Sequence, residues 1–149
     1  MHVSRKADYA VRALSFLAGR TDDGLVLISE IAGVVSVPQP FLSKIMRELV
    51  DAGIVESQPG RGGGYRLARA ASLVSFRQII EAVEGPVHMV PCQEDASPCL
   101  MAESCTQVPV WDRIRLRMLE VFAEYTLEQV RSPRSSSDPP LIQMGIPVA

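Results

Sequence analysis

The sequence is poor in the side chains on which most enzyme active sites depend. Its two histidines, His2 and His88, have no nucleophile pattern nearby, and the chain shows neither paired carboxylates nor a metal-hydrolase motif. The glycine-rich segment at 59–64 has neither Gly-x-Gly-x-x-Gly nor Walker spacing, so it does not predict a nucleotide site. These absences argue against an enzyme.

Long hydrophobic runs are absent as well. No apolar stretch reaches the roughly 20 residues that a membrane-spanning helix needs, and Arg5, Lys6 and Asp8 come before the first apolar run. We therefore expect a soluble protein of the cytoplasm. Its 149 residues, 47% of them hydrophobic, fit one domain that buries a core, plus an extension.

The first half of the chain carries the pattern of a helix-turn-helix. Apolar residues at three- and four-residue spacing predict a helix over 4–19. Ser29 and Glu30 indicate the start of a short helix that ends at Ala32 or Gly33, followed by a turn at 34–36. The next helix is predicted from Pro38 to near Gly53, with a buried face made of Phe41, Leu42, Ile45, Met46 and Leu49. Two helices joined by a short turn are typical of DNA-binding modules.

The exposed face of this third helix is the predicted reading surface. Gln39 has the chemistry to pair with a base edge, Ser43 with a base or a phosphate, and Lys44 mainly with a phosphate. A solvated helix face without a nucleic-acid role is the alternative. The helix residues that we expect to contact DNA are Pro38, Gln39, Pro40, Ser43 and Lys44.

A β-hairpin wing is predicted directly after the helix-turn-helix. Short strands over 54–57 and 65–67 flank the turn Pro59-Gly60-Arg61-Gly62-Gly63-Gly64. Glycines without side chains allow backbone amides, here of Gly62 and Gly63, to approach a phosphate backbone or a narrow minor groove beside Arg61. The alternative is an ordinary glycine-rich hairpin, although a neutral turn needs one or two glycines rather than four.

The net charge of −2 hides an uneven distribution of charge. Residues 1–69 hold nine Lys or Arg against seven Asp or Glu, whereas residues 70–149 hold six against ten. The basic excess therefore lies in the part that carries the predicted DNA-reading module. Because the excess is small, we expect a dimer, which doubles the basic surface.

All three cysteines fall in one short segment. Six residues separate Cys92 from Cys99, and five separate Cys99 from Cys105. Bunched thiols in a short chain without a secretory segment are more often metal ligands or redox groups than a disulfide framework, and an odd number cannot all pair internally. An iron-sulfur cluster, a zinc site completed by His88, and free thiols all remain open on spacing alone.

The second half of the chain is predicted to be helical, apart from the cysteine segment and the tail. Ser75 caps a helix that runs through Val83 and ends before Gly85 and Pro86. A long helix is predicted over 110–130, and its apolar stripe is wider than one small domain needs, so we expect it to dimerise. The predicted interface residues are Trp111, Ile114, Met118, Val121, Phe122 and Tyr125.

The predicted fold is mainly α with a small β-hairpin wing, a winged helix-turn-helix followed by a long dimerisation helix. We divide the chain into a DNA-binding domain at 1–86, a cysteine-rich loop at 87–109, the dimerisation helix at 110–130 and a tail at 131–149. The tail is rich in serine and proline, and we expect most of it to be disordered.

In this order, the motifs make the chain resemble the BadM/Rrf-type winged-helix regulators over residues 1–130. The resemblance is carried by Ser-Arg-Lys-Ala-Asp-Tyr-Ala-Val-Arg at 4–12, Arg-Gly-Gly-Gly-Tyr-Arg-Leu at 61–67, Glu-Ala-Val-Glu-Gly at 81–85 and the cysteine triplet. It is strongest toward the cluster-binding branch, with its IscR-, NsrR- and RirA-like members. The resemblance implies a homodimer that binds near-palindromic operators and whose DNA affinity changes with the state of a bound cluster.

The resemblance also implies a ligand set. The family's three cysteine ligands fall on Cys92, Cys99 and Cys105. IscR-like members carry a histidine three residues after the last cysteine, where this chain has Val108. NsrR-like members use an aspartate of the first helix, which reaches the partner's cluster, and Asp8 matches it. RirA-like members show that three cysteines also serve without the aspartate, so the fourth ligand and the number of irons stay open.

From the sequence we predict a DNA-binding transcriptional repressor whose operator affinity is controlled by an iron-sulfur cluster that senses nitric oxide, redox state or iron supply. Its expected partners are double-stranded operator DNA and a second copy of the chain. One alternative is a regulator that uses zinc or a thiol switch without a cluster. The other is a metal carrier that binds no DNA.

Overall fold

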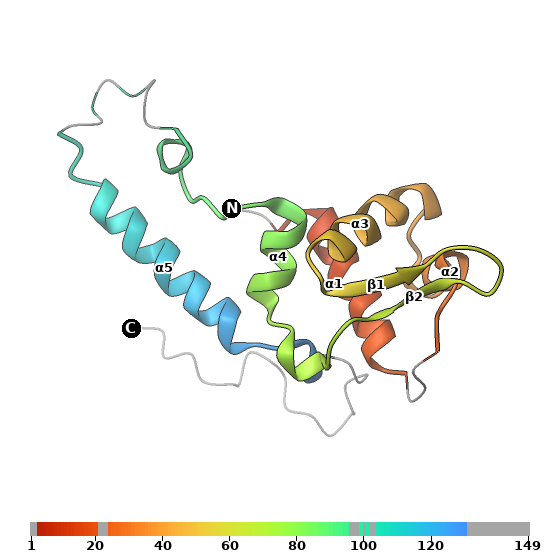
Figure 1. Cartoon of the computed structure of the whole chain (residues 1–149). Coiled ribbons are helices and arrows are strands. Elements are labelled where there is room, and N and C mark those ends of the chain that lie inside the picture. The colour runs from red at the N-terminus through yellow and green to blue at the C-terminus, as the bar shows by residue number, and fades with distance from the viewer. Residues whose placement is uncertain (1–2, 21–23, 96–98, 100, 102–103, 131–149) are drawn as a thin grey trace.

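The computed structural model describes residues 3–20, 24–95, 99, 101 and 104–130. The α-helices in this part are α1 (Arg5–Ala18), α2 (Ile28–Val35), α3 (Gln39–Asp51), α4 (Phe76–Glu84) and α5 (Val108–Glu124). The strands β1 (Val55–Gln58) and β2 (Gly64–Leu67) form an antiparallel hairpin. The described part also contains three short 3₁₀ turns: η1 (Ala71–Leu73), η2 (Pro91–Gln93) and η3 (Leu127–Gln129). The predicted class, mainly helical with a small hairpin wing, is confirmed (Figure 1).

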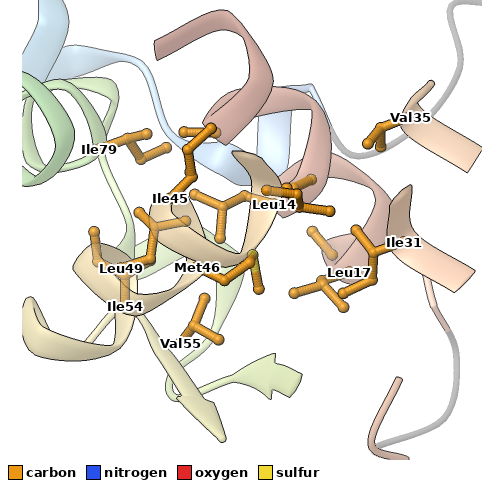
Figure 2. Close-up of a cluster of buried hydrophobic side chains, with 14 of the residues drawn as sticks. Leu14, Leu17, Ile31, Val35, Ile45, Met46, Leu49, Ile54, Val55 and Ile79 are labelled. Carbon is orange, nitrogen blue, oxygen red and sulfur yellow. The ribbon is translucent and has the colours of Figure 1, made fainter. Parts of the chain in front are cut away.

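Helix α1 is the centre of the fold. The side chain of Ser4 accepts a hydrogen bond from the backbone N–H of Ala7 at 3.1 Å and caps the helix, which therefore begins one residue later than predicted. Its buried face consists of four alanines and two leucines, and α2, α3 and α4 all pack against this helix. Figure 2 shows Leu14 and Leu17 of this helix among Ile31, Ile45, Met46 and other core side chains.

The helix-turn-helix forms, but the bounds of α2 differ from the prediction. The helix begins at Ile28, one residue before Ser29, and it ends at Val35, past Gly33. Ser29 therefore lies inside the helix, and Leu27 precedes it without any side-chain cap. The turn places Ser36 in the left-handed region with φ 56°. The start of α2 is decided by the neighbouring strand contact of Val26 rather than by a capping residue.

Helix α3 confirms most of its predicted buried face. Leu42, Ile45, Met46 and Leu49 are buried, whereas Phe41 was wrongly assigned to the core and is 42% exposed. The ring of Phe41 packs edge to face on Tyr9 of α1, with centroids 5.8 Å apart and planes at 88°. An aromatic ring at the edge of the buried face thus ties α3 to α1 outside the core.

The hairpin that follows is held to the helices by a third backbone segment. The register pairs Val55 with Leu67 and Gln58 with Gly64. Val26 and Tyr65 exchange backbone hydrogen bonds of 2.9 Å in both directions, which joins the segment before α2 to β2. The wing is therefore anchored on both sides of β2, by β1 and by the chain before α2.

Helix α4 begins and ends as predicted, within one residue. Ser75 and Gln78 form a reciprocal capping box, with bonds of 3.3 Å and 3.0 Å. Gly85 ends the helix with φ 79°. Figure 1 shows α5 lying beyond α4, on the side of the domain away from the wing.

The predicted single helix over 110–130 is wrong at both ends. Helix α5 runs from Val108 to Glu124, and the backbone becomes extended at Tyr125. The chain then turns back to the DNA-binding part: the N–H of Leu127 donates to the carbonyl of Val74 at 2.8 Å, and that of Phe76 to Tyr125 at 2.9 Å. Leu127 is completely buried in the main core.

The predicted disordered tail at 131–149 lies outside the described residues. Among the described helices, none has the length and apolar composition to cross a membrane.

Candidate DNA-reading surface and cysteine loop

The predicted reading residues of α3 lie together on its outer face. Gln39 and Lys44 are exposed, as are Pro38 and Pro40, which occupy the cap position and the first turn. Ser43 is half-buried, and its hydroxyl donates to the carbonyl of Gln39 at 2.9 Å. The N-terminal end of α3 therefore presents amide, hydroxyl and ammonium groups to the outside, which is the chemistry that reads base edges and phosphates.

Arg47 belongs to the same surface and was missed in the sequence. It is exposed and stands three residues after Lys44, hence on the same face of the helix. The spacing of the two basic residues was the signal that could have identified it. Next to it, Glu48 forms an ion pair of 2.9 Å with Lys6 of α1, and Lys6 also donates to the carbonyl of Val83. These contacts fix the orientation of α3 against α1 and α4.

The wing tip exposes Arg61, whereas its glycines serve mainly the hairpin itself. Gly62 has φ 79°, a conformation that favours glycine. A Cβ on Gly63 would lie 2.1 Å from the backbone oxygen of Gln58, and one on Gly64 would lie 2.4 Å from that of Val26. The N–H of Gly63 is already bonded to the carbonyl of Gly60 at 3.0 Å. Positive φ at Gly60 and Gly62 and close backbone packing at Gly63 and Gly64 thus account for the number of glycines. Arg61 is the charged group that the turn presents.

The three cysteines are free thiols in different environments. Cys92 lies in η2 and is half-buried, Cys105 is half-buried three residues before α5, and Cys99 is exposed. Cys92 lines a cavity of about 270 Å³ together with Trp111, Asp112 and Arg115. Two of the thiols therefore flank the first turns of α5.

A polar contact fixes η2 to α5. The side-chain amide of Gln93 donates to Oδ1 of Asp112 at 3.0 Å. Its carbonyl oxygen accepts from the N–H of Met89 at 2.6 Å and from that of Val90 at 3.4 Å. The residue next to Cys92 thus links the start of the cysteine loop to the long helix.

The donor set of this loop has the chemistry of an iron-sulfur site, since thiolates are the usual ligands of such clusters. Within 3–20, 24–95, 99, 101 and 104–130, however, the side chains of His, Cys, Asp and Glu do not gather in groups of three or more. The structure of the single chain thus supplies three free thiols on one loop without bringing them to a common centre.

The other ligand candidates lie apart from Cys92. His88 lines a second cavity, of about 260 Å³, with Ser4, Glu84 and Phe122, and its Nδ1 is buried without a hydrogen-bond partner. This separation gives no support to a zinc site that combines His88 with Cys92. Asp8, on α1, is held by Arg12 through contacts of 3.1 Å and 2.7 Å.

Much of the predicted apolar stripe of α5 is uncovered. Leu119 is the buried residue of this helix, while Ile114, Val121 and Tyr125 are between 41% and 47% exposed. Trp111, Met118 and Phe122 are half-buried. The two apolar residues Val110 and Leu116 are also exposed, by 57% and 52%.

A helix-turn-helix with a basic hairpin wing, followed by a long helix, defines a DNA-binding transcriptional regulator. A family model described as Rrf2, iron-dependent transcriptional regulator, matches residues 3–133. The chain belongs to this family.

Named relatives agree with this assignment. The chain is 31% identical over 131 residues to the HTH-type transcriptional regulator NsrR of Bacillus licheniformis, an alignment that covers 87% of this chain and 92% of that protein. Its fold is similar to the structure of CymR, the global cysteine regulator of B. subtilis, with TM-score 0.70, 28% identity and coverage of 91% and 99%. The structure of T. potens IscR matches with TM-score 0.67 and 26% identity over 91% of this chain and 94% of that one. The protein is therefore a transcriptional regulator and not an enzyme, and the metal-carrier alternative has no support.

Proposed function

We propose that this regulator is a cytoplasmic repressor whose operator affinity is controlled by an iron-sulfur cluster held by Cys92, Cys99 and Cys105. The observation that carries the proposal is that all three thiols are free and belong to one loop directly before α5. Similarity to NsrR and IscR proteins supports it. Nitric oxide, redox state and iron supply are the candidate signals.

The route from the loop to the DNA runs through packed elements. A bound cluster would supply irons that react with nitric oxide or oxygen. Cys92 is tied through Gln93 and Asp112 to α5, α5 packs on α4, and α4 packs on both α1 and α3. A change in the arrangement of the cysteine loop can therefore shift α5 relative to the reading helix.

A second copy of the chain completes the proposal. The exposed stripe of α5 gives the surface for a symmetric contact, and two reading helices would then face the two halves of a near-palindromic operator. Asp8 carries a 44% exposed side chain, so it is accessible to a partner's loop, and it would have to leave Arg12 to act as a ligand there.

Absorption spectroscopy combined with iron, sulfide and zinc analysis tests the cluster. Protein purified without oxygen should show broad visible absorbance with matching iron and sulfide. Cys92→Ala should abolish this absorbance and change operator affinity while the circular dichroism spectrum stays the same. Ser104→Ala, in the same loop, is the control and should keep both properties.

A colourless protein with zinc, or one without metal after anaerobic reconstitution, would contradict the cluster. In that case the free thiols, two of them half-buried beside α5, would support a thiol switch instead. Normal operator affinity and normal response in Cys92→Ala would reject the coupling between the loop and DNA.

Arg61→Ala tests the DNA contact of the wing. If Arg61 contacts a phosphate, its loss should weaken binding to specific and nonspecific duplexes alike, and should lower the slope of log affinity against log salt by about one. Arg113→Ala is the control, because Arg113 is an exposed arginine of α5. Equal salt slopes for both variants, measured by fluorescence anisotropy, would exclude a wing contact with the phosphates.

A further inference from the structure

A third cavity, of about 370 Å³, collects basic side chains on a part of the domain that neither the reading helix nor the cysteines use. Arg20, Arg66 and Arg69 all line it, while Glu128 is the carboxylate among its described lining residues. Its lining residues come from the end of α1, the end of β2 and η3, and both β2 and η3 contact α1. β2 leads away from this point toward the wing tip, so Arg61 stands at the other end of the strand.

The three arginines differ in their contacts. Arg20 pairs with Glu30 at 3.1 Å, and Arg66 pairs with Glu56, so both are partly neutralised by carboxylates that do not line the cavity. Arg69 has a buried Nε without a hydrogen-bond partner. A buried donor that belongs to a cation is costly to leave unpaired, and an anion that enters the cavity would supply the missing acceptor.

The chemistry of the cavity selects a small oxyanion. Guanidinium groups are planar forks that bind carboxylate and phosphate oxygens in pairs. The volume of about 370 Å³ admits a free phosphate, sulfate or small carboxylic acid, whereas a buried Nε is poorly placed for the backbone of a rigid duplex. We propose that Arg69, with Arg20 and Arg66, binds a small free oxyanion in this cavity.

The site gives the regulator a second input, separate from the cysteines. Arg66 is part of β2 and Arg69 follows that strand, while Arg20 follows α1 and Glu128 belongs to the turn after α5. An anion held between them would clamp the base of the wing to α1 and to the end of the long helix. Bound oxyanion should therefore change operator affinity without any change in absorbance.

Calorimetric titration of the full-length protein with inorganic phosphate, at constant ionic strength set with chloride, tests the proposal. We expect saturable binding that Arg69→Gln weakens by about tenfold or more, the factor that one charge-assisted hydrogen bond typically supplies. Arg20→Gln should weaken it as well, which guards against a folding defect in the first variant. Arg113→Gln removes one exposed positive charge outside the cavity and should bind phosphate like the wild type.

Three results would overturn the proposal. The first is a flat titration of the wild type, or equal weakening in Arg69→Gln and Arg113→Gln. The second is phosphate binding that appears only in Glu128→Gln, which would show that this lining carboxylate occupies the proposed anion site. The third is that Arg69→Gln weakens duplex binding in phosphate-free buffer although free phosphate does not bind, which would assign the site to DNA phosphates.

Discussion

At the scale of single residues, different residues of the wing serve the hairpin geometry and the proposed DNA contact. Gly63 and Gly64 are needed because backbone oxygens of Gln58 and Val26 approach them closely. Arg61 has no such structural constraint and stands exposed at the turn. The sequence motif therefore combines residues that shape the hairpin with one exposed arginine that is available for the proposed DNA contact.

Two glycine substitutions test this distinction. Gly63→Ala should destabilise the protein by about 1–3 kcal/mol, the range for overpacking, because its Cβ would lie 2.1 Å from a backbone oxygen. Gly33→Ala, on the exposed side of α2 with nothing within 4 Å of its Cβ, should instead stabilise the helix by about 0.5–1 kcal/mol.

Urea denaturation at one fixed protein concentration measures both glycine variants. An unchanged midpoint for Gly63→Ala would show that the turn relaxes around the new methyl group. The glycines would then be free to serve DNA contact alone.

At the scale of elements, the segment that follows α5 attaches this long helix to the DNA-binding part. Glu124 ends the helix, and three residues later Leu127 is completely buried in the core that also holds the helix-turn-helix, where η3 packs against α1 and η1. The bridge between Ser75 and Thr126 adds backbone contacts to this side-chain anchor. The long helix is therefore fastened at its C-terminal end to the DNA-binding part.

Leu127→Ala tests the anchor. It should lower the free energy of unfolding by about 2–5 kcal/mol, because the removed atoms are fully buried and leave a cavity. Leu73→Ala is the matched control: Leu73 is 65% exposed, so its truncation should have little effect. If the two variants unfold at the same urea concentration, the contact of η3 with the core contributes nothing to stability.

At the scale of the whole molecule, several large apolar side chains of α5 are left exposed in the single chain. The stripe joins helix positions three and four residues apart, such as Ile114, Met118 and Val121. Apolar surface of this extent on a helix usually marks an interface. A second chain placed there would also bring a second wing and reading helix to one operator.

Ile114→Glu tests the interface. A charge on the stripe should shift the protein toward monomer and weaken operator binding, because each monomer alone contacts half of a palindromic site. Arg113→Glu places the same carboxylate one residue earlier, away from the stripe, and should leave the oligomeric state unchanged. Sedimentation velocity measures the oligomeric state of the wild type and both variants. A wild type that already sediments as a monomer would refute dimerisation through α5.

The sequence by itself determined the class of the protein and most of its elements. Periodic apolar residues located α1 and α3 within one or two residues, because each of these helices buries a continuous face. The cap at Ser75 and the stop at Gly85 located α4 within one residue. The glycine-rich turn between two short apolar runs located the hairpin, and the ordered motifs identified the regulator family. The triplet of cysteines identified the candidate sensing loop, since their clustering is visible without any structure.

Only the tertiary structure decided where contacts between distant segments override local pattern. Val26 pairs with Tyr65, so α2 starts before its apparent cap, and Leu127 reaches the core, so the long helix ends at Glu124. Phe41 packs on Tyr9 outside the core, and Arg20, Arg66 and Arg69 line one cavity although as many as 48 residues lie between them in the sequence. Local spacing reports which face of an element is buried, whereas these partners are chosen by the packing of the whole chain.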